Sequence, residues 1–269
     1  MAKNGMEIKL PEFEQTLIGS LNSIDKVIAV MSGKGGVGKS TVTALIASAL
    51  AKSGFRVGIL DADITGPSQP RAFGLKSQGL NGGMYGITPI QTRSGIKMIS
   101  TNFMLKEEDD PVVWRGPLLA GAVKQFWEET DWQDLDYLVV DLPPGTGDVP
   151  LTVLQSLPVD GLVIVSSPQD LAYMVVMKAV KMANQMKIPI LGLIENMSEL
   201  ICPHCGEALK IFGDSQGEAA AKKMEINFLG SLPWDIHLNQ LVDQGQVEEY
   251  YSAELARIVE KIIIKPEES

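Results

Sequence analysis

A glycine-rich segment early in the chain has the composition and spacing of a phosphate-binding loop. Residues 32–41 read SGKGGVGKST, which contains the pattern GxxxxGK[ST] between an apolar segment and an amphipathic one. In such a loop the glycines let backbone N–H groups face phosphate oxygens, the lysine reaches the β- and γ-phosphates, and the serine hydroxyl binds Mg²⁺. We therefore predict a nucleotide site formed by Gly33, Lys34, Gly35, Gly36, Val37, Gly38, Lys39, Ser40 and Thr41.

Acidic residues follow two later apolar segments. Asp61 and Asp63 come directly after residues 56–60, and Asp141 ends the segment YLVVD. Residues two apart on a strand face the same side, and ligands of open α/β sheets bind at the carboxyl ends of strands. An acid that ends a buried strand is also the position from which phosphate-loop enzymes hold Mg²⁺. The alternative is that these acids cap the turns that follow the strands.

The only two cysteines lie three positions apart in the stretch LICPHCGEAL, residues 200–209. Cys202 and Cys205 have the CxxC spacing of metal-binding and redox-active pairs. Four interpretations stay open: incidental thiols, a thioredoxin-type redox pair, part of a structural zinc site, and half of an iron–sulfur site completed by a second chain. Zinc takes four ligands, and the available histidines are His204, between the cysteines, and the remote His237. Two chains related by a two-fold axis supply four thiolates, which favours the shared cluster.

The periodicity of apolar residues indicates how the fold brings these groups together. Mostly continuous apolar runs predict strands buried on both faces of a parallel sheet, at 26–31, 56–60, 96–100, 137–141, 161–166, 190–195 and 227–232. Helices are expected at 39–53, 117–130, 150–156, 170–187, 216–225 and about 248–264. This alternation predicts an α/β fold with a doubly wound, mainly parallel sheet.

We expect one domain over residues 26–269, with the CxxC loop at 202–205, after a polar tail or short helix over residues 1–25. Residues 64–95 are rich in Gly, Pro, Ser and Thr without a clear period, and are expected to be loop.

Bulk properties argue against several classes of protein. The net charge of −10 does not favour a surface that coats nucleic acid, and no apolar run is long enough to span a membrane. The start, MAKNGMEIKL, lacks the apolar region of a secretory signal. We therefore expect a cytoplasmic protein with neither nucleic acid nor membrane as a partner. In that compartment a CxxC pair is more often metal-binding or redox-active than structural.

A second lysine, Lys34, lies directly after the first glycine of the loop and makes the loop resemble that of a known group of proteins. The string GKGGVGKST is similar to that of the deviant P-loop ATPases, which include partition ATPases, division-site ATPases and the nitrogenase iron protein. The resemblance implies a homodimer in which Lys34 reaches the partner's phosphates, as an arginine finger does. It assigns catalysis to Lys34, Lys39 and Asp63, with Asp63 orienting or activating the attacking water. Asp61 and Asp141 would then lie, with Ser40, around Mg²⁺.

The whole set of motifs resembles the Mrp/ApbC family of P-loop iron–sulfur carrier ATPases. The segments SGKGGVGKST, DADITGPS, VWRGP, DLPPGTGD, ENMS and CPHCG occur in family order over about residues 26–240. The resemblance implies an ATP-binding homodimer that carries a bridging [4Fe–4S] cluster on Cys202 and Cys205. It implies transfer of this cluster to apo-proteins, cluster assembly factors as further partners, and empty or zinc-containing protein after aerobic preparation. It also places Asn196 at the adenine edge, and Pro233 and Asp235 in the wall of the base pocket.

One departure and one alternative accompany this interpretation. Many bacterial relatives carry an N-terminal domain where this chain has only about 25 residues before the first expected strand. The alternative function is a MinD/ParA-type positioning or partitioning ATPase with structural zinc at the CxxC. Membrane-binding members of that class end in a basic amphipathic helix, whereas this chain ends ARIVEKIIIKPEES.

Overall fold

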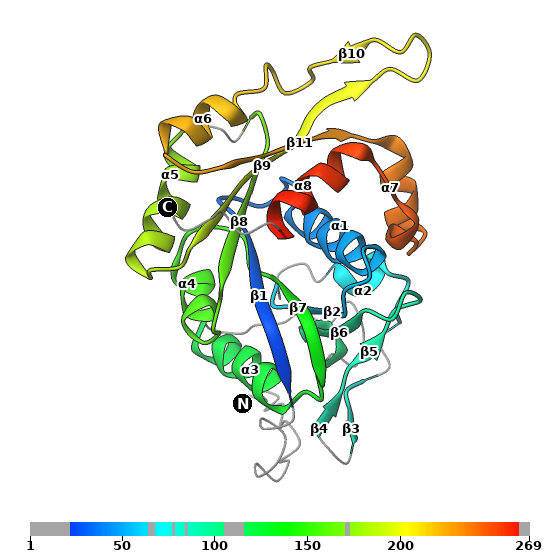
Figure 1. Cartoon of the computed structure of the whole chain (residues 1–269), viewed down its shortest axis with the longest axis vertical. Coiled ribbons are helices and arrows are strands. Elements are labelled where there is room, and N and C mark those ends of the chain that lie inside the picture. Colours follow the sequence, from blue (N-terminus) through cyan, green and yellow to red (C-terminus); the bar gives the residue numbers. More distant parts are fainter. Residues whose placement is uncertain are drawn as a thin grey trace, which may run out of the picture.

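The computed structural model describes residues 22–63, 68–76, 79–83, 86–104, 116–169 and 173–263. Its strands are β1 (Ser23–Ser32), β2 (Val57–Asp61), β3 (Asn81–Gly83), β4 (Gly86–Thr88), β5 (Ile90–Gln91), β6 (Lys97–Ser100), β7 (Asp134–Asp141), β8 (Gly161–Ser166), β9 (Ile190–Ile201), β10 (Ala208–Leu209) and β11 (Phe228–Trp234). Nine of them form one sheet in the order β10-β9-β8-β1-β7-β2-β6-β5, with β11 paired to β9 (Figure 1). β3 and β4 form a separate antiparallel pair.

The central strands are parallel and buried because their sequences are continuous apolar runs. Every residue of β2 and β8 is buried. β1 pairs in parallel with β7 and β8, and β2 pairs in parallel with β7 and β6. Only β5 and β10 add antiparallel pairs to this sheet. The carboxyl ends of β1, β2 and β7 consequently lie side by side at one edge.

Helices cover both faces of the sheet (Figure 1). They are α1 (Lys39–Lys52), α2 (Gln69–Ala72), α3 (Gly116–Glu129), α4 (Asp148–Gln155), α5 (Tyr173–Gln185), α6 (Gly217–Lys223), α7 (Ile236–Asp243) and α8 (Ala253–Ile263), with 3₁₀ turns at Thr101–Met104 and Val247–Glu249. Leu45 of α1 and Ile258 of α8 join one apolar core, while Val123 of α3 and Ala183 of α5 join a second one. The predicted α/β class with a mainly parallel sheet is confirmed. Within the described residues, no helix is long and apolar enough to cross a membrane.

Every predicted strand is present, and so are the first five predicted helices within a few residues. Two local predictions are wrong, and two further elements were not predicted. The described parts of residues 64–95 are not all loop, because they contain α2, β3, β4 and β5. These elements have two to four residues each, which is too short for an apolar period to form. Helix α7 and strand β10 were not predicted. The last helix begins at Ala253 rather than 248, because Tyr250 has an extended backbone (φ −66°, ψ 138°).

Candidate functional site

The glycine-rich loop leaves the carboxyl end of β1 and enters α1 at Lys39. Gly36 (φ +87°) and Gly38 (φ +79°) adopt the left-handed backbone that favours glycine. A Cβ at Gly38 would lie 2.3 Å from Nδ2 of Asn196. A Cβ at Gly35 or Gly36 would meet no described atom within 4 Å beyond its chain neighbours. The loop is therefore tight where it enters the helix and open around its middle, as a phosphate cradle requires.

The other predicted loop residues support this shape. At Gly33 a Cβ would come 1.9 Å from Cγ1 of Val175, so only glycine lets α5 approach the loop this closely. Val37 is buried in the apolar core that contains Leu45 of α1. Its carbonyl accepts a hydrogen bond from Nδ2 of Asn196 at 2.9 Å. Ser40 and Thr41 lie half-buried in the first turn of α1.

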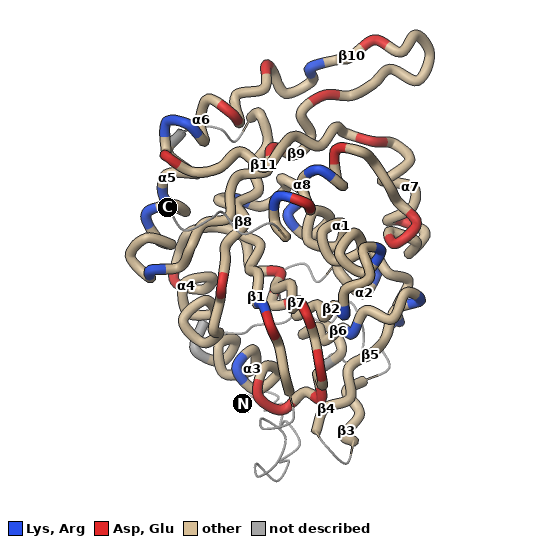
Figure 2. Tube along the Cα trace, in the orientation of Figure 1, with Lys and Arg blue, Asp and Glu red and all other residues tan. Residues whose placement is uncertain are grey.

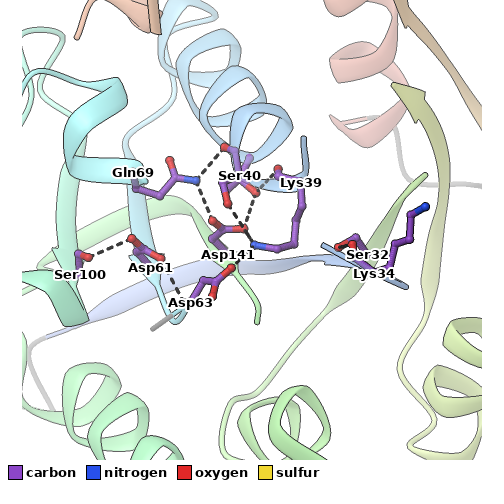
Figure 3. Close-up of polar contacts among 10 residues, drawn as sticks. Ser32, Lys34, Lys39, Ser40, Asp61, Asp63, Gln69, Ser100 and Asp141 are labelled. Carbon is purple, nitrogen blue, oxygen red and sulfur yellow. Dashed lines mark hydrogen bonds and ion pairs between the residues drawn. The ribbon is translucent and has the colours of Figure 1, made fainter. Parts of the chain in front are cut away.

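Lys39 lies within a group of carboxylates (Figure 3). Its Nζ is 2.5 Å from Oδ1 of Asp141 and 3.3 Å from Oδ2 of Asp63, and it donates to Oγ of Ser40 at 3.2 Å. Burial alone would lower the pKa of Lys39, but the charges of Asp141, Asp63 and Asp61 raise it above its ordinary value. The lysine that the motif assigns to phosphates is thus an ammonium ion that neutralises carboxylates.

Asp141 is fully buried at the end of β7, in register with Asp61 of β2. Besides Lys39, Oδ1 accepts a hydrogen bond from the hydroxyl of Thr43 at 3.1 Å. Oδ2 accepts one from Nε2 of Gln69 at 3.0 Å, and the same amide donates to the carbonyl of Ser40 at 2.8 Å. Donors from α1 and α2 therefore fix both carboxylate oxygens.

Asp61 is also fully buried, and it has no lysine in direct contact among the ion pairs of the described residues. Its Oδ2 accepts a hydrogen bond from Oγ of Ser100 at 2.9 Å, and its Oδ1 accepts one from the backbone N–H of Asp63 at 3.2 Å. Burial raises the pKa of Asp61 well above its ordinary value, and the charge of Asp141 adds to this. Ionisation of this carboxyl group is therefore less favourable here than in water.

Lys34 differs from Lys39 in being exposed. Figure 3 shows its ammonium group directed away from the cluster of Lys39, Asp63 and Asp141. Its backbone carbonyl accepts a hydrogen bond from Oγ of Ser32 at 2.9 Å, which fixes the start of the loop. Its assignment to the phosphates of a second chain stays a prediction.

The residues assigned to the base pocket lie in or just after β9 and β11. Asn196 is buried and contacts the loop through Val37, as described above. Asp235 caps α7, because its Oδ1 accepts hydrogen bonds from the N–H groups of His237 (2.7 Å) and Leu238 (3.3 Å). Its Oδ2 accepts one from the hydroxyl of Tyr250 at 3.0 Å. Burial and this hydrogen bond raise the pKa of Tyr250 to about 12. The carboxylate of Asp235 is thus already engaged within the chain.

Pro233 lies half-buried in β11, immediately before Trp234 and the cap of α7. Contact of this segment with a nucleotide base stays a prediction.

The two cysteines lie on a hairpin formed by the end of β9, β10 and their connection. We call residues 197–216 the cysteine hairpin. It projects from the rest of the molecule (Figure 1), and its two strands share only the register pairs Ile201–Ala208 and Leu200–Leu209. Cys202 is half-exposed and Cys205 is exposed, and both are free thiols.

The turn around the cysteines favours a thiolate. The N–H of Cys202 donates to the carbonyl of Glu207, and the N–H of Gly206 donates to the carbonyl of Cys202, both at 2.9 Å. Hydrogen bonds from the backbone N–H groups of Cys205 and His204, and from the Cys205 thiol, lower the pKa of Cys202. Across the residues that the structure describes, no group of three or more His, Cys, Asp or Glu side chains is arranged to hold a metal ion. One chain therefore presents two sulfur donors without further ligands from its described part.

Three polar residues of the cluster were not predicted: Thr43, Gln69 and Ser100. Thr43 lies four residues after Lys39 on the same helix face, so its position was available from helical spacing. Ser100 ends a predicted strand that lies next to β2. Its place at a strand end gave a weaker indication that it would lie near the carboxylates. Nothing in the sequence indicated that Gln69 would contact Asp141, because its helix lies in a segment expected to be loop. Arg115 of the VWRGP motif lies outside the described residues.

Known proteins resemble this chain over most of its length. A family model described as the NUBPL iron-transfer P-loop NTPase, of ParA type, matches residues 23–265. An iron–sulfur cluster carrier protein of Clostridium perfringens is 46% identical over 235 residues, covering 85% of this chain and 82% of the relative. One of Methanocaldococcus jannaschii is 44% identical over 257 residues, covering 92% and 89%. The iron–sulfur cluster transfer protein NUBPL of Dictyostelium discoideum is 45% identical over 229 residues, covering 84% and 70%.

Solved structures give the same result for the fold. A nucleotide-binding protein from Archaeoglobus fulgidus in complex with ADP matches with a TM-score of 0.78 and 48% identity, covering 86% of this chain and 90% of the other. The cell division ATPase MinD of Pyrococcus furiosus matches with a TM-score of 0.65 and 20% identity, covering 88% and 98%, so it shares the fold alone. The resemblance found in the motifs is confirmed, and the chain belongs to the family of NUBPL-type iron-transfer P-loop NTPases.

Proposed function

We propose that this protein is a homodimeric, ATP-hydrolysing carrier that holds a [4Fe–4S] cluster between two chains and transfers it to apo-proteins. One observation carries the proposal: the exposed cysteine hairpin presents two thiols, and the described residues of the same chain add no further metal ligands. The names of relatives at 44–46% identity support a role in cluster transfer. We place the protein in the cytoplasm, where thiols stay reduced, with cluster assembly factors as further partners.

The phosphate loop and its carboxylates account for the nucleotide chemistry. Lys39 leaves Asp141 and binds the β- and γ-phosphates, while Ser40, Asp61 and Asp141 lie where Mg²⁺ would be held. These groups fit that ion because they are hard oxygen donors, and bound Mg²⁺ neutralises developing phosphate charge. Asp63, whose carboxylate lies 3.3 Å from Lys39, orients the attacking water.

A second chain completes both sites in this proposal. Lys34 is directed away from its own carboxylate cluster and supplies a positive charge to the partner's phosphates (Figure 3). Two cysteine hairpins related by a two-fold axis provide the four thiolates that a [4Fe–4S] cluster requires. A lowered pKa at Cys202 favours cluster binding, because the thiolate is the ligand.

The rival positioning ATPase finds less support. A DNA-binding member of that class needs a continuous basic surface. In the view of Figure 2, Lys and Arg are spread over several elements, among them α1, α2, α3, α5 and α6, and acidic residues lie between them.

Anaerobic reconstitution with iron and sulfide tests the proposal. Wild-type protein should become brown, elute as a dimer, and contain about four irons per two chains. Cys202→Ala should remain colourless, whereas His204→Ala, which changes the residue between the cysteines, should reconstitute like wild type.

The same preparation separates the alternatives. A brown monomer with its own cluster would contradict the shared site. A colourless wild-type protein that binds one zinc per chain and sediments with DNA or liposomes upon addition of ATP would support the positioning ATPase instead.

A further inference from the structure

Glu195 is a buried carboxylate that the nucleotide chemistry does not use. It lies in β9, where it is fully buried and in register with Ser166 of β8 and Ser231 of β11. Its Oε1 accepts hydrogen bonds from the backbone N–H groups of Gln216 and Gly217, both at 3.0 Å, and its Oε2 accepts one from the hydroxyl of Ser215. All three donors belong to the point where the cysteine hairpin returns to the body of the protein.

The contact between Glu195 and this returning segment is tight. A Cβ at Gly217 would lie 2.6 Å from Cε2 of Phe228 and 3.0 Å from Cβ of Glu195. Only glycine therefore lets the chain approach β9 and β11 this closely. The segment of the hairpin that returns from β10 makes a second contact with the body, because Phe212 stacks on Trp234 with ring centroids 5.7 Å apart.

The neighbouring residue on β9 faces the nucleotide loop. Successive side chains of a strand point to opposite faces, so Glu195 and Asn196 diverge. Asn196 donates to the carbonyl of Val37 in the phosphate loop at 2.9 Å. Its Nδ2 would lie only 2.3 Å from a Cβ at Gly38, so the Asn196 side chain packs closely against the backbone of the loop at this residue. Two adjacent residues of one strand thus contact the phosphate loop and the base of the cysteine hairpin.

This strand segment cannot adjust each contact independently. The peptide that joins Glu195 and Asn196 is planar and rigid, and β9 is held between β8 and β11 at this point. A displacement of the backbone at Asn196 would therefore be shared by the backbone of Glu195, whose carboxylate accepts the three hydrogen bonds from Ser215, Gln216 and Gly217. The two strands of the hairpin share only two register pairs. Its contacts with the body, at Glu195, at Trp234 of β11 and at the carbonyl of Leu232, therefore determine where Cys202 and Cys205 are held.

We propose that Glu195 is a positioning residue that links the phosphate loop to the cysteine hairpin, so that nucleotide state alters how firmly a cluster is held. This inference rests on the proposed carrier function and adds a named route between its two sites. Such coupling is reciprocal in binding free energy, so a bound cluster also changes nucleotide affinity by the same factor.

The test compares iron release in two nucleotide states. Reconstituted protein is exposed anaerobically to an iron chelator with ADP or with a non-hydrolysable ATP analogue, and the ratio of the two release rates is measured. We expect wild type to give a ratio of about fivefold or more, and Glu195→Ala to reduce it to near unity. Affinity of the cluster-free protein for ADP should change less than about twofold, because Glu195 contacts none of the phosphate-loop groups.

Three variants keep the test specific. Glu195→Gln retains a carbonyl oxygen for Gln216 and Gly217 and should retain most of the ratio. Ser215→Ala removes one of the three donors and should give an intermediate ratio. Glu207→Ala removes an exposed carboxylate from the same hairpin and should behave like wild type.

Each result decides the question. If Glu195→Ala releases iron faster by the same factor in both states, so that the ratio is kept, Glu195 merely stabilises the hairpin and the inference is wrong. A wild-type ratio of one would also overturn it, while the carrier function would stand. Wild-type protein that takes up no cluster would overturn the carrier function itself.

Discussion

Replacing Lys39 with methionine should destabilise the nucleotide-free protein, although this lysine belongs to the phosphate loop. Lys39 and Asp141 have side chains 5% and 0% exposed, and their charged atoms are 2.5 Å apart. Removing one partner of a buried ion pair costs about 3–5 kcal/mol, because it leaves the other charge uncompensated. Thr43 and Gln69 continue to donate to Asp141, each bond contributing about 1 kcal/mol. We therefore expect the free energy of unfolding to fall by about 3 kcal/mol, the lower end of that range.

Urea unfolding at neutral pH, with EDTA and without nucleotide, measures this loss. The double variant Lys39→Met/Asp141→Asn removes both charges, so it should recover about half of the lost stability or more. Lys34→Met is the matched control, since it removes an exposed lysine from the same loop and should change stability by about 0.5 kcal/mol or less. If Lys39→Met unfolds at the wild-type urea concentration, or the double variant is no more stable than the single one, the pair does not stabilise the empty site.

Other predictions concern the loop, the partner chain and acid stability. Gly38→Ala should lower stability by about 1–3 kcal/mol and weaken ATP binding in fluorescence titrations, because its backbone is left-handed and its Cβ would displace Asn196. Lys34→Ala should lower ATP turnover by roughly 100-fold or more and abolish ATP-dependent dimers in gel filtration, with ATP still bound. Hydrogen bonds from Arg56 hold the pKa of Asp136 below its ordinary 3.8, so its stabilisation is present above that pH and is lost as pH falls. The difference in Tm between wild type and Asp136→Asn should therefore shrink below pH 3.8, and a constant difference would contradict this.

The sheet and the position of the carboxylates were predictable because burial leaves a simple pattern. A strand covered on both faces must be apolar along its length, so residues 56–60 and 137–141 are recognisable without their neighbours. Acids at the ends of such strands then meet at one edge, and the register of Asp61 with Asp141 confirms this. Pairing of Lys39 with Asp141 and Asp63 was not predictable, because the motif describes the nucleotide-bound role of the lysine and carries no information about the empty loop.

Asp235 shows a different limit of the sequence analysis. The resemblance assigns it to the base pocket, which stays a prediction, and gives no sign of the helix that it caps. The segment DIHLNQLVD nevertheless begins with a favoured capping residue and places Leu238 and Leu241 three residues apart, which is a helix start signal. Local physical chemistry would have predicted α7, with its cap and its buried face, where reasoning from the family motif did not.

The position of the cysteines is the least predictable feature, because few contacts within the hairpin itself determine it. A ladder of two register pairs is marginal on its own, so contacts at the base and at the exposed surface decide where the thiols lie. Beside the thiols, Ile201, Leu209 and Ile211 are 47%, 41% and 54% exposed. Burying such side chains fully contributes about 1.5–3 kcal/mol each, so a second copy that covered them would gain affinity from the same contacts that bring four sulfurs together. The sequence therefore identifies the two thiols, whereas in the proposed carrier their arrangement would depend on Glu195 on one side and on a partner chain on the other.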